Sequence, residues 1–324
     1  MKWIITGGCG FIGRALIRHL NSEGGHKIRV YDNLSVGTRD DLAGEAPFVE
    51  LPDDNLSDWS ADLALIKGDI LEADHLRAAA AGADILIHLA ANTGVAPSVE
   101  DPYSDCHTNV MGTLNALEAC RHENLNRMVF ASSGAPLGVQ TPPLHEEMAA
   151  HPASPYGASK LAGEGYCSAY FHCYGVESVV LRFGNVYGEG STRKASVVAK
   201  FIKLAMAGET LEIYGDGSQT RDFIYIGDLI RAVYAAATTP GVGGETFQIA
   251  TSAETTVGAL TERLVAAIQE VTGIEPKWIN GEQRAGDVAR NFSDTSKAAA
   301  QLNWTPKMDL DEGLRRTVRF FAEQ

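Results

Sequence analysis

The 324-residue sequence lacks any apolar run long enough to span a membrane. Its cysteines are few, and the five of them have no metal-ligand spacing: Cys9, Cys106, Cys120, Cys167 and Cys173. Basic residues are scarce too, since 27 lysines and arginines face 41 aspartates and glutamates, for a net charge of −14. These shortages argue against a membrane protein, a disulfide scaffold, a metal site and a partner that is a nucleic acid or an anionic membrane. We expect a cytoplasmic protein without a signal peptide, whose five thiols are buried or half-buried.

The first half of the chain alternates short apolar stretches with amphipathic ones. Strands are expected near 2–6, 27–31, 63–66, 84–88, 127–131 and 178–182. Helices are expected between them, at about 11–23, 72–81, 104–122 and 155–174, and 38–62 is expected to be an irregular surface excursion. This alternation predicts an α/β fold with a doubly wound parallel sheet of the Rossmann type.

The second half has a shorter, mixed pattern. It predicts helices at 196–208, 257–272 and about 310–322, with strands at 211–217 and 247–249. We therefore expect a Rossmann domain over 1–184 and a smaller mixed α/β substrate-binding domain over 185–324, which caps the carboxyl edge of the sheet. Segments at about 218–250 are expected to return to the first domain.

Three glycines follow the first strand with the spacing G-x-x-G-x-x-G. Gly7 permits a tight turn, Gly10 lets the backbone approach a pyrophosphate, and Gly13 lets the next helix pack closely. An ordinary turn is the alternative, but a helix follows at once and Asp32 ends the second strand. Because Asp32 can accept hydrogen bonds from a ribose and repels a 2′-phosphate, the pattern predicts NAD rather than NADP.

A second group of residues suggests proton transfer. Tyr156 and Lys160 lie four residues apart at the start of a predicted helix, so they share one face. The ammonium is expected to lower the phenol pKa and make Tyr156 a usable base. Ser132 and Ser133 follow a strand at the sheet edge where ligands bind, and a hydroxyl there could bridge Tyr156 and a substrate, although a turn or capping role is the alternative.

Ordered motifs along nearly the whole chain extend these patterns. They are Thr-Gly-Gly-Cys-Gly-Phe-Ile-Gly at 6–13, Tyr-Asp-Asn-Leu-Ser at 31–35, Gly-Asp-Ile at 68–70, His-Leu-Ala-Ala at 88–91, Asn-Val-Met-Gly-Thr at 109–113, Tyr-Gly-Ala-Ser-Lys at 156–160, Leu-Arg-Phe-Gly-Asn-Val-Tyr-Gly at 181–188, Gly-Asp-Gly-Ser-Gln-Thr-Arg-Asp-Phe at 215–223 and Arg-Ala-Gly-Asp at 284–287. With them the chain resembles the extended short-chain dehydrogenase/reductase family, in its nucleotide-sugar epimerase and dehydratase group.

The resemblance implies an NAD that stays bound and is regenerated in each turnover. It assigns the adenosine half to Phe11, Ile12, Asp32, Asn33, Leu34 and Ser35, and the adenine to Asp69 and Ile70. It assigns the diphosphate and ribose path to Leu89, Ala90, Ala91 and Thr93, with Asn109 behind. The remaining cofactor contacts are expected from Ala131, Ser132, Tyr156, Lys160, Phe183 and Val186.

The resemblance also implies a nucleotide-diphosphate sugar, a UDP-hexose above all, as substrate. Its expected contacts are Ser133, Asn185, Ser196, Val197, Tyr214, Arg221, Arg284, Asp287 and Asn291. Among these, Arg221 and Arg284 resemble the arginines that grip the diphosphate, which an acidic protein needs locally. Relatives that accept only plain hexoses often have tyrosine at the place of Asn291, so we expect room for a 2-acetamido group.

The expected reaction is 4-epimerisation, with Ser133, Tyr156 and Lys160 as catalytic residues. Dehydratases of this group have an acidic pair where this chain has Gly134 and Ala135, which cannot move protons. A dehydratase, a decarboxylase, a multi-position epimerase or a non-catalytic NAD-binding protein remain alternatives. Pro136 and Leu137 replace the family's usual Val-Tyr and leave the shape of the sugar pocket open. A homodimer through helices 104–122 and 155–174 is implied as well.

Overall fold

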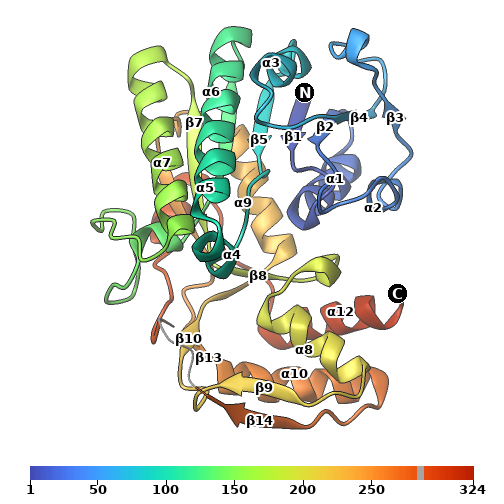
Figure 1. Cartoon of the computed structure of the whole chain (residues 1–324), viewed down its shortest axis with the longest axis vertical. Coiled ribbons are helices and arrows are strands. Elements are labelled where there is room, and N and C mark those ends of the chain that lie inside the picture. The colour runs from blue at the N-terminus through green and yellow to red at the C-terminus, as the bar shows by residue number, and fades with distance from the viewer. Residues whose placement is uncertain (283–287) are drawn as a thin grey trace. The chain divides into compact units, whose positions relative to one another are not determined.

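The computed structural model describes residues 1–282 and 288–324, and these residues form two compact units (Figure 1). Unit 1 consists of Met1–Val139, Glu146–Arg182 and Ala232–Phe247. Unit 2 consists of Gln140–His145, Phe183–Arg231 and Gln248–Gln324. Each unit is therefore assembled from segments that are distant in the sequence.

An eight-stranded sheet is the scaffold of unit 1. The strand order is β12-β7-β6-β5-β1-β2-β4-β3, and every neighbouring pair from β6 to β3 is parallel. The strands are β1 Lys2–Thr6, β2 Lys27–Asp32, β3 Val49–Glu50, β4 Leu63–Lys67, β5 Ile85–His88, β6 Arg127–Ser133, β7 Ser178–Phe183 and β12 Thr246–Ile249. Most of their side chains are buried, because helices cover both faces of a doubly wound sheet.

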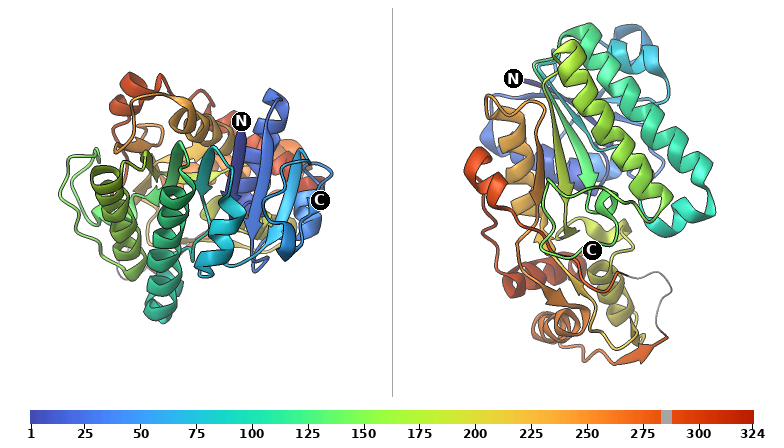
Figure 2. Two further views of the ribbon diagram at one scale, coloured as in Figure 1. Left: turned by 90° about the horizontal axis from the view of Figure 1, so that it is seen from above. Right: turned by 90° about the vertical axis from the view of Figure 1, so that its left-hand side faces the viewer.

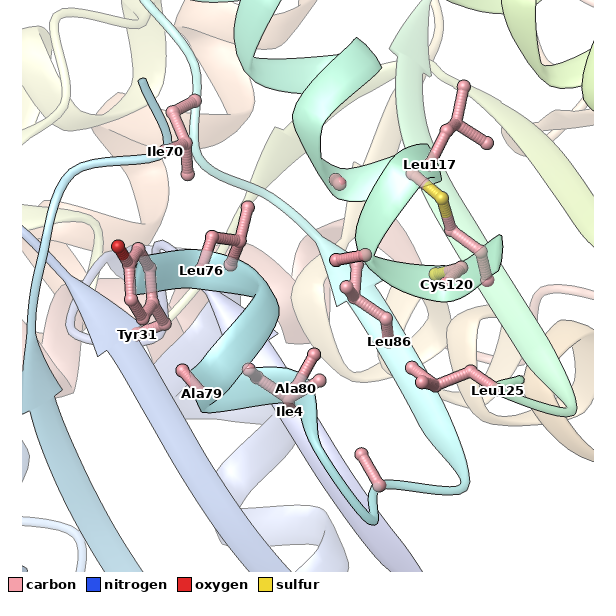
Figure 3. Close-up of a cluster of buried hydrophobic side chains, with 14 of the residues drawn as sticks. Ile4, Tyr31, Ile70, Leu76, Ala79, Ala80, Leu86, Leu117, Cys120 and Leu125 are labelled. Atoms are coloured by element: carbon pink, nitrogen blue, oxygen red, sulfur yellow. The ribbon is translucent and has the colours of Figure 1, made fainter. Parts of the chain in front are cut away.

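Helices α3 (Ala73–Ala80), α6 (Gly112–Glu123) and α7 (Pro155–Tyr174) cover one face of this sheet (Figure 2). Their small residues, such as Ala79, Ala80 and Cys120, pack against Ile4 and Leu86 of the strands (Figure 3). On the other face, Trp3 of β1 stacks on Tyr234 of α9 (Ile226–Thr238), and α1 (Phe11–Glu23) contributes His19 to the same cluster. The sheet is thus held from both sides and presents the ends of its strands at one edge.

The start of α7 is fixed by local sequence. Ser154 caps the helix, since its hydroxyl accepts a hydrogen bond from the Gly157 amide at 3.1 Å, and Pro155 occupies the first turn. Gly175 ends the helix in the left-handed conformation. These signals place Tyr156 and Lys160 in its first two turns.

Shorter elements complete unit 1. They are α2 (Arg39–Ala43), α4 (Val95–Glu100), α5 (Pro102–Cys106) and the 3-10 turns Asp53–Asn55 and Ala135–Leu137. A π-type turn at His107–Met111 joins α5 to α6, so the single helix expected at 104–122 is interrupted there.

Within residues 1–282 and 288–324, unit 2 contains three two-stranded sheets, four whole helices and the start of α9. The pairs are β8 (Asn185–Tyr187) with β11 (Phe223–Tyr225), β9 (Leu211–Tyr214) with β14 (Trp278–Gly281), and β10 (Thr220–Arg221) with β13 (Thr255–Thr256). The helices are α8 (Val197–Met206), α10 (Val257–Thr272), α11 (Ser296–Leu302) and α12 (Leu310–Ala322), with a 3-10 turn at Ser191–Arg193. Helix α12 packs against α10 and α8, which gives the unit its own core.

The predicted fold class is confirmed, and the six strands expected in the first half are present within two residues of their expected ends. One expectation on cysteines is wrong. Cys9, Cys120 and Cys167 are buried, but Cys106 and Cys173 are exposed. Cys173 lies in the last turn of α7, where residues 172–175 are all exposed, and Cys106 ends α5, which packs on other helices. In residues 1–282 and 288–324, no helix combines the length and the apolar character that crossing a membrane requires.

Candidate active site

The glycine-rich turn between β1 and α1 forms a close-fitting backbone cradle. Gly7 has a φ of +71°, and a Cβ there would lie 2.8 Å from the Ala90 amide nitrogen. A Cβ on Gly13 would lie 2.5 Å from the Gly8 Cα, so only glycine allows α1 to approach the loop this closely. Gly10 precedes α1, and no side chain caps this helix in the described structure. The amides of its first turn, which includes Phe11 and Ile12, are a suitable site for a pyrophosphate.

Asp32 at the end of β2 is tied to the same loop. One carboxylate oxygen accepts a hydrogen bond from the Cys9 amide at 2.9 Å, and the other accepts one from the Leu34 amide at 2.8 Å. Burial raises the Asp32 pKa, while the two amide bonds oppose that rise. Each oxygen still has a lone pair, so the fixed carboxylate fits the ribose hydroxyls of a dinucleotide.

The adenosine end continues into a cavity of about 1080 Å³, lined by residues that include Asn33, Glu50, Lys67 and Asp69. The Asn33 side-chain amide donates to Asp69 at 2.9 Å, which brings two of the predicted residues together across β2 and β4. Ser35 is exposed beside them, and its amide donates to Asn33 at 3.0 Å. The Ile70 side chain belongs instead to the hydrophobic core, where it is 5% exposed.

Asn109 holds the loop that follows β5. Its side-chain oxygen accepts from the Asn92 amide at 2.8 Å, and its amide group donates to the Asn92 carbonyl, to Asp105 and to Ser159. The residues predicted to line the diphosphate and ribose path lie within three positions of Asn92 in the chain: Leu89, Ala90, Ala91 and Thr93. This polar hub therefore fixes the backbone that is expected to flank the cofactor.

The predicted catalytic residues meet where α7 crosses the end of β6. Ser133 is close enough to Tyr156 to lower the pKa of its phenol by hydrogen bonding. The Lys160 ammonium is buried and donates to the Ala131 carbonyl at 2.9 Å. It also lies 4.9 Å from the centre of the Phe130 ring. A phenol, a serine hydroxyl and a buried ammonium are thus brought together at one strand end, as acid–base chemistry on a hydroxyl requires.

The expected effect of Lys160 on Tyr156 is wrong for the protein alone. The Tyr156 pKa is raised, because burial and the Asp105 charge outweigh the lowering effect of the Ser133 bond. Burial also lowers the Lys160 pKa to about 8, which weakens the ammonium as a charge partner. The spacing of four residues correctly predicts a shared helix face, but it cannot show that Lys160 donates to the strand.

Two charged residues beside this cluster escaped the sequence analysis. Glu164 is one helical turn beyond Lys160, and Arg182 is on β7, and they form a buried ion pair with a Nη2–Oε2 distance of 2.7 Å. Glu164 also accepts a hydrogen bond from Ser132. The signal for Glu164 is present in the sequence, since Tyr156, Lys160 and Glu164 recur at intervals of four residues.

Several predicted residues of unit 2 lie at the ends of its elements: Asn185 begins β8, Tyr214 ends β9, Arg221 ends β10, and Ser196 and Val197 stand at the start of α8. Asn185 is exposed on β8 and Val186 is buried beside it, while Phe183 at the end of β7 is half-buried. Ser196 and Val197 begin α8, and the Ser196 hydroxyl has no hydrogen-bond partner within the described residues. Arg284 and Asp287 fall in 283–287, outside the described residues.

Tyr214 and Arg221 are held by neighbours in unit 2. The Lys200 ammonium lies 5.3 Å from the centre of the Tyr214 ring, and the Gln219 side chain donates to the Tyr214 carbonyl at 2.8 Å. Arg221 donates to the carbonyls of Thr220 and Val288. The Asn291 amide donates to the Thr220 hydroxyl at 3.3 Å, which places Asn291 near β10.

Known proteins share the sequence pattern and the fold of this chain. Residues 3–250 match the NAD-dependent epimerase/dehydratase family. The chain is 35% identical to a UDP-glucose 4-epimerase of Mycolicibacterium smegmatis, over 100% of this chain and 99% of that protein. In structure it is similar to a UDP-glucose 4-epimerase of Thermotoga maritima solved with UDP-glucose, with a TM-score of 0.87, 32% identity, and 100% and 99% of the two chains covered.

A third similar protein is a UDP-N-acetylglucosamine 4-epimerase of Methanobrevibacter ruminantium, solved in complex with UDP-N-acetylmuramic acid. The TM-score is 0.86 at 30% identity, over 99% of this chain and 98% of the other. The family match over residues 3–250 includes the glycine cradle, Asp32 and the Tyr156–Lys160 pair. It confirms the predicted family and its cofactor, NAD. The chain belongs to the NAD-dependent epimerase/dehydratase family.

Proposed function

We propose that this chain catalyses the NAD-dependent 4-epimerisation of a UDP-hexose. The substrates would be UDP-glucose and UDP-galactose or their N-acetyl forms. The observation that carries the proposal is the cluster of Tyr156, Ser133 and Lys160 at the end of β6, which only β5 separates from β1 and its glycine cradle in the same sheet. Its full-length similarity to 4-epimerases supports the same reaction.

The residues of the cluster have separate tasks in this reaction. Tyr156 takes the proton of the sugar 4-hydroxyl, and the Ser133 hydroxyl bridges the two oxygens. NAD would supply a reversible hydride acceptor for C4 of the sugar, so that the oxidation and the reduction balance. Lys160 would hold the nicotinamide ribose, and its charge is available below a pH of about 8.

The inversion needs a 4-keto sugar that turns within the site. Once the keto sugar has turned about its diphosphate, the opposite face of C4 would be reduced by the same cofactor, and Tyr156 would return the proton to the 4-oxygen. The two residues directly after Ser133 cannot move protons, since Gly134 and Ala135 occupy the places where dehydratases have acidic residues. A dehydratase, a decarboxylase or a multi-position epimerase is the alternative, and each would give a different product.

We assign NAD binding mainly to 1–184 and nucleotide-sugar binding mainly to 185–324. The uridine and diphosphate contacts would come from Asn185, Ser196, Val197, Tyr214 and Arg221, together with Arg284 and Asp287, which lie outside the described residues. The buried Ser196 hydroxyl at the start of α8 has no hydrogen-bond partner among the described residues, which supports a polar ligand there. Because Asn291 is smaller than a tyrosine, the site would also accept a 2-acetamido sugar.

A homodimer through α6 and α7 is part of the proposal. These helices lie side by side (Figure 1) and, together with α5 and the turn that follows it, they expose Tyr103, Met111, Tyr166 and Tyr174. Exposed aromatic and methionine side chains on adjacent helices are typical of protein interfaces. The free cysteines support a reducing compartment such as the cytoplasm, where the enzyme would serve carbohydrate metabolism.

Product analysis tests the function directly. The purified protein is incubated with UDP-glucose and, separately, with UDP-N-acetylglucosamine, and the products are identified by mass spectrometry and proton NMR. We expect the corresponding 4-epimers, of unchanged mass, from both substrates. A 4-keto-6-deoxy product or loss of carbon dioxide from a uronic acid would refute 4-epimerisation, and strict preference for UDP-glucose would refute the role of Asn291.

A further inference from the structure

A buried charge cluster lies directly behind the catalytic residues of unit 1. Arg182 donates to Glu164 through Nε at 2.9 Å and through Nη2 at 2.7 Å, so the two side chains form a two-point fork. Both side chains are 7% exposed. A fork of this kind fixes the plane of the carboxylate as well as its position.

Ser132 connects this fork to the strand that carries the catalytic contacts. Its hydroxyl donates to the Glu164 Oε1 at 2.5 Å, and the Ser132 residue is 3% exposed. The residue before it, Ala131, accepts the hydrogen bond of the Lys160 ammonium. The residue after it, Ser133, interacts with the Tyr156 hydroxyl.

Three consecutive residues of β6 therefore interact with three residues of α7 that are spaced one turn apart, and two of these contacts are hydrogen bonds of 2.5 and 2.9 Å. Ala131 contacts Lys160 and Ser133 contacts Tyr156. Ser132, which stands between them in the strand, contacts Glu164. Removing two charges from water costs free energy, which a buried ion pair recovers only when its hydrogen bonds are well aligned. An apolar pair of similar volume often stabilises a fold equally well. Because the Glu164–Arg182 pair lies beside the catalytic side chains, its position points to a role in orienting them.

We propose that Glu164 is a positioning residue, which, held by Arg182 and bonded to Ser132, fixes the end of β6 against α7 so that Ser133 and Ala131 meet Tyr156 and Lys160. Glu164 touches neither the substrate nor the cofactor in this scheme. Its charge also favours the ammonium form of Lys160. The inference rests on the proposed roles of Tyr156 and Lys160 in epimerisation.

Replacing Ser132 removes its hydrogen bond to Glu164 and leaves no buried charge without a partner, so it tests the proposal cleanly. Ser132→Ala keeps the ion pair and deletes only the hydroxyl. Because the Ser132 hydroxyl is bonded to Glu164, the cofactor contact expected of this residue would come from its backbone, which alanine keeps. We therefore expect kcat for UDP-glucose epimerisation to fall on the order of 10-fold, with KM and bound NAD unchanged, as for outer-shell partners of functional groups. Because the Ser133 bond lowers the Tyr156 pKa, loosening it moves the acid limb of the kcat profile to higher pH.

Ser178→Ala is the matched control. Ser178 is also a buried strand serine whose hydroxyl bonds to α7, at the Cys167 carbonyl at 2.8 Å, but it has no contact with the catalytic residues. We expect this variant to keep wild-type kcat and pH profile. Ser132→Thr retains the hydroxyl and should restore most of the activity lost in Ser132→Ala.

Four results separate the possible explanations. Equal kcat and pH profiles in Ser132→Ala and Ser178→Ala would overturn the proposal, and so would loss of NAD from Ser132→Ala, which would assign Ser132 to the cofactor. Glu164→Gln should show the same shift of the kcat–pH profile as Ser132→Ala. If Glu164→Gln folds and keeps the wild-type profile, the proposal is also overturned. Tyr156→Phe separates failure of the positioning proposal from failure of the proposed function. An active Tyr156→Phe enzyme would refute the assignment of the catalytic site itself.

Discussion

The contact between Gly13 and the loop before α1 gives a prediction that can be worked out in numbers. A Cβ on Gly13 would lie 2.5 Å from the Gly8 Cα and 2.6 Å from the Gly8 carbonyl oxygen. Ordinary contacts begin near 3.4 Å, so Gly13→Ala must shift α1 or the loop by about 0.9 Å, the difference between the two distances. Both contacts are with backbone, which cannot rotate away, and overpacking of this kind costs about 1–3 kcal/mol.

The same shift would disturb the amides that are expected to hold the pyrophosphate. We therefore expect Gly13→Ala to lower the thermal midpoint of the cofactor-stripped protein by at least about 2 °C and to lower the NAD that copurifies with the enzyme. Differential scanning calorimetry gives the first quantity, and chromatography of the acid-released nucleotide gives the second.

Gly44→Ala is the control for this prediction. Gly44 ends α2 with a φ of −64°, and a Cβ there would meet its nearest atom at an ordinary 3.5 Å. Alanine should be neutral there or stabilise the fold by about 0.4–1 kcal/mol. If Gly13→Ala matched Gly44→Ala in midpoint and in NAD content, the close approach of α1 to the loop would not be required for cofactor binding.

Three further predictions concern the chemistry of the site. Tyr156→Phe should keep its NAD while turnover of UDP-glucose falls about 100–10,000-fold, and near-normal turnover would contradict its role as base. Since burial lowers the Lys160 pKa to about 8, its ammonium is present below that pH and lost above it, so kcat/KM should decline above pH 8. A profile that stays level to pH 9.5 would show that the charge of Lys160 is not needed. The stripped protein should bind NAD at least about 10-fold more tightly than NADP by calorimetry, and Asp32→Asn should narrow this difference because it removes the repelling charge. Equal binding of both by the wild type would exclude that role of Asp32.

The sequence alone was sufficient for the parts of the fold that are encoded locally. The strand before Gly7, the positive φ of that glycine and the helix after Gly10 follow from a few adjacent residues. The helix that carries Tyr156 and Lys160 has its own cap at Ser154 and its own stop at Gly175. Each of these elements could be predicted because its signal lies within one or two turns of the chain.

Other features depend on residues that are distant in the sequence. The three-residue strands β8 and β11 are too short for periodicity to reveal them. Arg182 lies 18 residues beyond its partner Glu164, and the pairing depends on β7 lying next to β6. The direction of the Tyr156 pKa shift depends on burial and on Asp105, which comes from another helix. Only the folded chain shows these distances and exposures.

The unequal exposure of the five cysteines provides a built-in probe of assembly. Cys106 and Cys173 are accessible on α5 and α7, whereas the other three thiols are enclosed in the core. A thiol reagent applied to the native protein should therefore label two sites quickly and three only after unfolding. If two copies associate through these helices, the fast labelling should slow as the protein concentration rises, so a simple colorimetric titration can follow subunit association without any added tag.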